Sequence, residues 1–178
     1  MAHNFFYKTL NVIGIMMIAF SLFSAENSYA VEIESMQGKQ SVSVFGNLTS
    51  SDNATTTLLG GSYGRFFTDN MEGTGTLMLM NFDGDFTVYL LYGRFNYNFV
   101  KAGATYIPYA GCALGVVGYD DGNVSDSAIS IGVQGGVKYF LSEDTSFNLE
   151  ASYTIAEIDS ESYDAFSITA GISFYFGD

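Results

Sequence analysis

Hydrophobic residues alternate with small or polar residues along the C-terminal third of the chain. The pattern runs from Ser127 to Phe140, from Ser146 to Ile155 and, in the opposite parity, from Phe166 to Phe176. A period of two residues is typical of a β-strand with one apolar face, whereas an amphipathic helix places apolar residues three and four positions apart. None of the three segments has the helical spacing, so the sequence predicts three strands here.

The same alternation continues upstream with less contrast, and turn-forming residues separate its segments. Asp83-Gly84 predicts a two-residue hairpin turn, because Asp-Gly accepts the positive φ angles that such a turn requires. The total is eight strands joined as successive hairpins, which is the smallest common number that closes a barrel in bacterial outer membranes. The five further strands are expected at Gln40–Ser50, Thr56–Phe67, Glu72–Asn81, Phe86–Asn98 and Thr105–Tyr119.

The first thirty residues have the pattern of an export signal. Lys8 precedes the apolar run Val12–Phe20, and Ser28-Tyr29-Ala30 supplies small residues at the two positions that signal peptidase reads. The alternative is a membrane anchor, but the run is shorter than the ~20 residues that a spanning helix needs. We therefore expect residues 1–30 to be a signal peptide cleaved after Ala30, and residues 31–178 to form one barrel domain.

The chemistry of the two strand faces separates a membrane barrel from a soluble one. A lipocalin-like carrier in the periplasm would bury its apolar face and present long polar side chains to water. Here the polar face of the late strands is mostly Ser, Thr, Gly, Asn and Gln, which suits the narrow interior of an eight-stranded barrel. Acidic residues gather in the connections, as on the rims of a membrane barrel. We expect an aromatic girdle near the strand ends, formed by Tyr89, Tyr97, Tyr119, Tyr139 and Phe176.

Several classes of function are disfavoured by composition. A net charge of -13 disfavours nucleic acid as a partner, because phosphate neutralisation requires clustered Lys and Arg. The single histidine, His3, lies in the expected signal, so no Ser-His pair or histidine zinc site is available. Cys112 has no partner for a disulfide and is interpreted as a small packing residue. We therefore expect no enzymatic activity, no cofactor and no metal.

Acidic residues around Gly122-Asn123, namely Asp120, Asp121 and Asp126, leave two alternatives open. Oxygen ligands of this kind can hold calcium, but their spacing does not match an EF-hand, which favours a solvated acidic loop. A second hypothesis is that the acidic rim binds divalent cations that also bridge lipopolysaccharide.

Three charged residues fall on the polar, inward face of the expected strands: Arg94, Lys138 and Glu150. Charges in a narrow lumen must be paired to offset their desolvation, so we expect a stabilising network. Placing Ser142 opposite Ser146 sets Lys138 opposite Glu150 and Gly135 beside Tyr153, both favourable cross-strand contacts. This register predicts a Lys138–Glu150 ion pair.

Four segments of the mature chain carry a recognisable pattern: Gly61–Asn70, Pro108–Gly115, Gly135–Leu141 and Gly171–Phe176. In these segments the chain resembles the outer-membrane-protein β-barrel domain family, which is related to the opacity-type and small porin-like proteins. This resemblance implies an eight-stranded barrel, signal-peptide export and insertion by the outer-membrane assembly machinery, and it implies no reaction.

Two features depart from the family pattern. Gly177-Asp178 follow Phe176, whereas members usually finish on an aromatic residue, and the expected outward connections are too short for an adhesin. We therefore expect a monomeric integral protein of the Gram-negative outer membrane, with both chain ends in the periplasm and with lipid and lipopolysaccharide as its surroundings. The expected role is structural or a surface interaction in the envelope, and the alternatives are a narrow porin-like channel for small solutes and the soluble periplasmic carrier.

Overall fold

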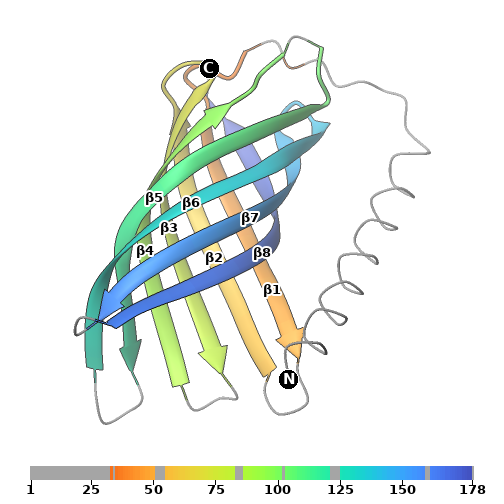
Figure 1. Ribbon diagram of the computed structural model, residues 1–178. Helices are drawn as coiled ribbons and strands as arrows, with labels where there is room; N and C mark the ends of the chain where they lie inside the picture. Colours follow the sequence, from red (N-terminus) through yellow and green to blue (C-terminus); the bar gives the residue numbers. More distant parts are fainter. Residues whose placement is uncertain are drawn as a thin grey trace. The chain divides into compact units, whose positions relative to one another are not determined.

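A computed structural model describes residue 33 and residues 35–50, 55–82, 86–101, 103–120, 125–158 and 161–177. Eight strands form a closed barrel in which each strand pairs with its neighbours in sequence and the first strand pairs with the last (Figure 1). All pairings are antiparallel, which confirms the predicted up-and-down barrel. The strands are β1 (Gln40–Ser50), β2 (Thr55–Phe66), β3 (Met71–Phe82), β4 (Phe86–Asn98), β5 (Tyr106–Asp120), β6 (Ser125–Ser142), β7 (Thr145–Ile158) and β8 (Glu161–Phe176).

Among the described residues, no helix is long and apolar enough to cross a membrane. The expected signal peptide and the cleavage site after Ala30 lie outside the described residues, as do most of the acidic connections.

Strand boundaries agree closely with the expected ones for β1 to β5, whereas β6 and β8 begin earlier. β8 starts at Glu161 instead of Phe166, because its first residues are polar and continue the hydrogen-bonded ladder without an apolar alternation.

The hairpin at Asp83-Gly84 also differs from expectation. Phe82 is paired with Phe86, so three residues and not two connect β3 to β4.

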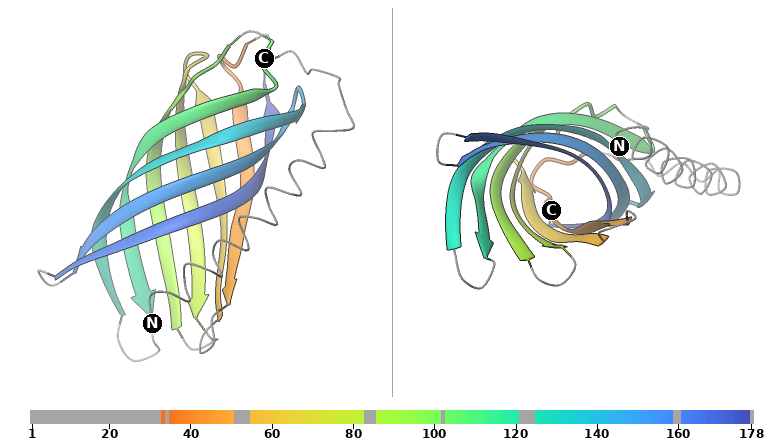
Figure 2. Two further views of the ribbon diagram at one scale, coloured as in Figure 1. Left: turned by 45° about the vertical axis from the view of Figure 1, so that its right-hand side comes forward. Right: turned by 60° about the horizontal axis from the view of Figure 1, so that its bottom comes forward.

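The barrel closes along a short seam between β1 and β8. Gln40 pairs with Phe176 and Gly46 pairs with Ala170, so both ends of the barrel chain lie at the same rim. Beyond that ladder the Asn47 side chain donates a hydrogen bond to the Ile168 carbonyl at 3.1 Å. The strands are inclined to the barrel axis (Figure 2), as closure of an eight-stranded sheet requires. We call the rim that carries Gln40 and Phe176 the terminal rim, and the opposite one the loop rim.

Burial in this barrel is the reverse of that in a water-soluble protein. The outer wall exposes large apolar side chains, among them Ile129 (70%), Phe166 (66%) and Leu114 (62%). The buried side chains of the interior include many polar and charged ones, such as Glu72 and Lys138. The assignment of the apolar face to the outside is thereby confirmed, and an apolar outer wall is what a bilayer requires of a barrel.

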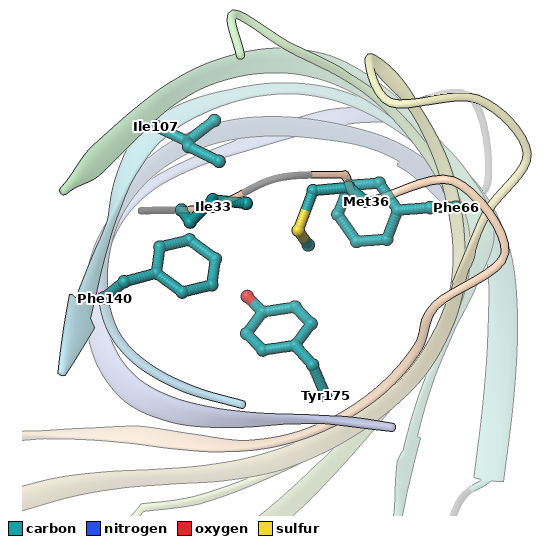
Figure 3. Packing of buried hydrophobic residues seen from close by; sticks show 6 residues of the cluster. All are labelled: Ile33, Met36, Phe66, Ile107, Phe140 and Tyr175. Atoms are coloured by element: carbon teal, nitrogen blue, oxygen red, sulfur yellow. The ribbon is translucent and has the colours of Figure 1, made fainter. Parts of the chain in front are cut away.

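An apolar cluster closes the terminal rim. Ile33 and Met36, which precede β1, point into the mouth of the barrel toward aromatic and aliphatic side chains from four strands (Figure 3). Phe140 and Tyr175 stack with ring centroids 5.2 Å apart. Met36 is fully buried, so the segment that carries Ile33 and Met36 blocks the mouth of the barrel. We call this segment the plug. The cluster consists of Ile33, Met36, Phe66, Ile107, Phe140 and Tyr175, with Val100 packed against it.

Asp69, in the turn between β2 and β3, holds the plug in place. Its Oδ1 atom accepts hydrogen bonds from Ser35 Oγ at 2.7 Å, from the Met36 amide at 2.8 Å and from the Gln37 amide at 3.0 Å. The Gly38 amide then donates to the Phe66 carbonyl at 3.0 Å, at a φ of 86° that favours glycine. Hydrogen bonds to the ionised carboxylate, first that of Ser35, lower the pKa of Asp69 below its ordinary value of 3.8.

Truncating the plug should destabilise the barrel. Met36→Ala leaves a cavity in the apolar cluster, and we expect it to lower the free energy of unfolding by about 2–5 kcal/mol, measured by denaturant titration in lipid vesicles. Met71→Ala is the matched control, because Met71 is exposed on the outer wall. Equal unfolding midpoints for the two variants would show that Met36 does not pack in the mouth.

Acidification should release the plug. Because the folded-state pKa of Asp69 is lowered, its stabilisation is complete above its unfolded value and is lost as the pH falls through the folded-state value. We expect the protection factors of the Met36 and Gln37 amides, measured by NMR hydrogen exchange, to fall under acidic conditions below pH 3.8. Asp69→Asn should lower them at neutral pH already; unchanged protection in that variant would contradict the assignment.

Candidate functional site

Four charged side chains meet in the lumen because strand alternation points each of them inward. Glu72 lies on β3, Arg94 on β4, Lys138 on β6 and Glu150 on β7. They line a cavity of about 60 Å³ together with uncharged side chains of the inner wall. Two cations and two anions make this group neutral, as the desolvation cost of buried charges requires. We call these four residues the lumen network.

The first ion pair joins Lys138 to Glu72. Lys138 Nζ lies 2.7 Å from Glu72 Oε2, and both side chains are at most 6% exposed. Glu72 also accepts hydrogen bonds from Asn96 Nδ2 at 3.2 Å and from Ser41 Oγ at 3.5 Å. Lys138 Nζ lies 4.7 Å from the centre of the Phe66 ring, so cation–π contact adds to the pairing.

The second ion pair joins Arg94 to Glu150 across the lumen. Arg94 Nη2 contacts Glu150 Oε1, and the Tyr109 hydroxyl donates to Glu150 Oε2 at 2.7 Å. Gly136 lies directly opposite Glu150, and a Cβ there would lie 2.8 Å from the Tyr109 ring. The missing side chain therefore lets Tyr109 reach the carboxylate.

A chain of amide side chains extends the network along the inner wall. Gln134 Nε2 donates to Asn96 Oδ1 at 2.9 Å and to the Cys112 carbonyl at 3.2 Å. Asn96 in turn donates to Glu72, so the bonds link β6, β4 and β3. Networks of this kind stiffen a polar interior because each group supports its neighbour's geometry.

The structure places Arg94, Lys138 and Glu150 in the lumen together, but the predicted Lys138–Glu150 ion pair is wrong. Lys138 lies opposite Asn148 and pairs with Glu72, while Glu150 pairs with Arg94. The cause is the turn: Ser142 faces Thr145 and not Ser146.

A bulge between Phe140 and Ser142 adds a second shift of one residue, so the turn and the bulge together move each β7 partner by two residues from the predicted one. Gly135 consequently faces Ala151, and Tyr153 faces Val133. Beyond the bulge, even-numbered residues of β6 face even-numbered residues of β7, as in the pair of Lys138 and Asn148. Inward residues therefore still pair with inward residues.

Glu72 and Tyr109 belong to the site but were not among the predicted residues. Glu72 could have been found, because it occupies the polar parity of β3 with Thr74 and Thr76. Tyr109 gives no comparable signal, since an aromatic residue in this composition is more often expected on the outer wall.

Metal-ligating side chains are not grouped in the part of the chain that the structure describes. No group of three or more His, Cys, Asp or Glu residues that could hold a metal ion occurs there. Cys112 is a free thiol and is exposed on the outer wall, so it does not pack inside the barrel.

Of the proposed aromatic girdle, Tyr89, Tyr97 and Phe176 are exposed on the outer wall. Tyr139 is half-buried, and the side chain of Tyr119 lies outside the described part. The Asp120, Asp121 and Asp126 side chains, proposed as a calcium loop or a solvated loop, lie outside it as well.

Solved structures of bacterial surface barrels are similar to this chain. The N-terminal β-barrel domain of Pseudomonas aeruginosa OprF shares 20% identity over 79% of this chain and 98% of its own, with a TM-score of 0.62. Neisserial surface protein A shares 17% over 78% and 96%, with a TM-score of 0.61. The outer membrane protein OprG of P. aeruginosa shares 12% over 81% and 98%, with a TM-score of 0.54.

No protein-family model and no curated protein sequence matches the chain. At these identities the structural likeness establishes the fold, and it confirms the resemblance to eight-stranded outer-membrane barrels. Together with the apolar outer wall, it identifies the chain as an integral outer-membrane β-barrel protein.

Removing one charge of the lumen network should cost more than removing a surface charge. Glu72→Gln leaves Lys138 buried without a counter-ion, and we expect a loss of about 3–5 kcal/mol in the free energy of unfolding in vesicles. Glu143→Gln, an exposed position in the β6–β7 turn, is the control and should be neutral. Recovery in the double variant Glu72→Leu/Lys138→Met would attribute the loss to the unpaired charge; equal stability of E72Q and E143Q would contradict the pairing.

Proposed function

We propose that this protein is a non-conducting structural barrel of the outer membrane, which supports the envelope or presents a small surface there. The proposal is carried by the closed interior. The plug fills the terminal rim, and the paired charges of the lumen network leave a cavity of only about 60 Å³. Eight strands enclose an interior that side chains nearly fill, so no wide aqueous path is expected.

The proposed orientation places the terminal rim in the periplasm. The orientation rests on the chain ends, which both lie at this rim and are expected in the periplasm. Connection length does not distinguish the rims, because the β6–β7 and β7–β8 connections each have two residues. The surroundings would be phospholipid and lipopolysaccharide, with insertion by the outer-membrane assembly machinery as the family resemblance implies. A monomer is proposed, since the β1–β8 seam closes the sheet within one chain. The loop residues of a surface interaction, and of the proposed divalent-cation bridging, lie outside the described part.

Planar-bilayer recording tests this proposal. The wild-type chain should give no stable current steps, while Met36→Ala/Arg94→Ser/Glu150→Ser should give small steps, because it truncates the plug, removes a whole ion pair and leaves the lumen neutral. The triple variant thus shows that the assay detects an opened lumen. Stable steps from the wild type would contradict a structural role.

A narrow channel is the second candidate, and one observation favours it. In the described part, six buried side-chain oxygens have no hydrogen-bond partner in the protein, and groups of this kind are usually satisfied by water. A row of water molecules bound to these oxygens would conduct protons or very small solutes. Vesicles loaded with a pH-sensitive dye would distinguish the candidates, because a channel would dissipate a proton gradient faster than protein-free vesicles do. The oxygens belong to Thr74, Thr76, Tyr92, Asn98, Ser130 and Ser167.

A soluble periplasmic carrier receives no support from the described residues. Such a carrier would place apolar side chains around an internal ligand, whereas the lumen here is lined by charges and amides. Recovery of the protein in the soluble envelope fraction would revive that alternative.

A further inference from the structure

The outer wall carries an apolar groove of about 550 Å³ over β2 to β5. The register explains it: Tyr63 lies opposite Gly75, Gly75 opposite Gly93, and Gly93 opposite Leu114. A Cβ at Gly75 would meet no atom within 4 Å, and one at Gly93 would lie 3.9 Å from the nearest. Two adjacent outward positions therefore lack side chains between the exposed Tyr63 and Leu114, which form the walls.

The Arg65 side chain lies at the end of the groove that is nearest the terminal rim. Arg65 lies opposite Gly73, one residue before the end of β2, and it lines the groove. Arg65 is exposed, and its guanidinium forms no ion pair or hydrogen bond with any described residue. An unpaired arginine beside an apolar channel offers bidentate hydrogen bonds to an anionic group.

We propose that this groove binds an anionic glycerophospholipid of the periplasmic leaflet, with one acyl chain over Gly75 and Gly93 and the phosphate on Arg65. The inference rests on the orientation proposed above. The apolar groove alone gives no selectivity, because bilayer tails are as apolar as the groove walls. The charge of Arg65 provides the preference, and the glycines let the chain lie close enough for the phosphate to reach it.

Charge placement around the barrel supports this choice of ligand. In the described part, Arg94 and Lys138 are buried in the lumen and Lys39 lies 4.0 Å from Asp144. Lys101 is exposed in the β4–β5 connection and does not line the groove. Arg65 is thus the cation that adjoins an apolar channel, and Lys101 is a matched cation without one.

Native mass spectrometry of the detergent-solubilised protein tests the site. With phosphatidylglycerol added, we expect the wild type to retain one lipid at least about tenfold more strongly than phosphatidylcholine, as a charge-assisted hydrogen bond allows. Arg65→Gln should abolish the preference, and Gly75→Leu should lower retention of both lipids by filling the groove. Lys101→Gln and Gly135→Leu, an outward glycine on β6 away from the groove, should behave as wild type.

Cys112 provides a second readout, because it lines the groove and is the only cysteine of the chain. Phosphatidylglycerol should slow its reaction with a maleimide in the wild type and not in Arg65→Gln. Equal retention of both lipids by the wild type, or equal behaviour of R65Q and K101Q, would overturn the proposal. Efficient Cys112–Cys112 disulfide formation in vesicles would overturn it as well, since it would assign the groove to a second copy of the chain.

Discussion

Closure of the sheet between β1 and β8 is the constraint on which the rest of this structure depends. Within a bilayer each unpaired backbone amide or carbonyl costs several kcal/mol, so a sheet can remain there only if its edges pair with each other. Here the pairing is made by the ladder from Gln40–Phe176 to Gly46–Ala170 and continued by the Asn47 side chain. Once eight strands close, the narrow radius of the lumen and the alternation of faces follow.

The narrow lumen explains why the charges occur as interlocked pairs. An unpaired cation in such an interior would carry an uncompensated desolvation cost, whereas Lys138–Glu72 and Arg94–Glu150 are neutral together and are held by amide and hydroxyl donors. The plug completes the closure at the terminal rim, where Asp69 fixes the backbone of Met36 and Gln37. The two devices close the lumen by different means, one electrostatic and one apolar.

Strand positions and faces were predictable from the sequence because both follow from the two-residue period. The boundaries of β1 to β5 agree closely with expectation, and the apolar parity proved to be the outer face. The ladder between β6 and β7 was not predictable, since the turn between Ser142 and Thr145 and the bulge between Phe140 and Ser142 together move every partner by two residues. A shift by an even number leaves the alternation of faces intact.

The partners in the lumen are harder still to infer, because they lie on different walls of the barrel. Glu150 reaches Arg94, which is 56 residues away and on a strand that does not adjoin β7. Alternation indicates that a residue points inward, but the tilt and stagger of the closed barrel decide which inward residues meet. Glu72 was identifiable as inward, whereas its pairing with Lys138 required the structure.

Hydrogen exchange of the backbone amides, measured by NMR in lipid nanodiscs, tests the central claim most directly. A closed barrel predicts slow exchange on every described strand, including the β1–β8 ladder around Val44 and Ile172, with cross-strand contacts between them. Fast exchange confined to β1 and β8, without those contacts, would mean an open sheet and would contradict the account of both the lumen and the membrane-facing wall.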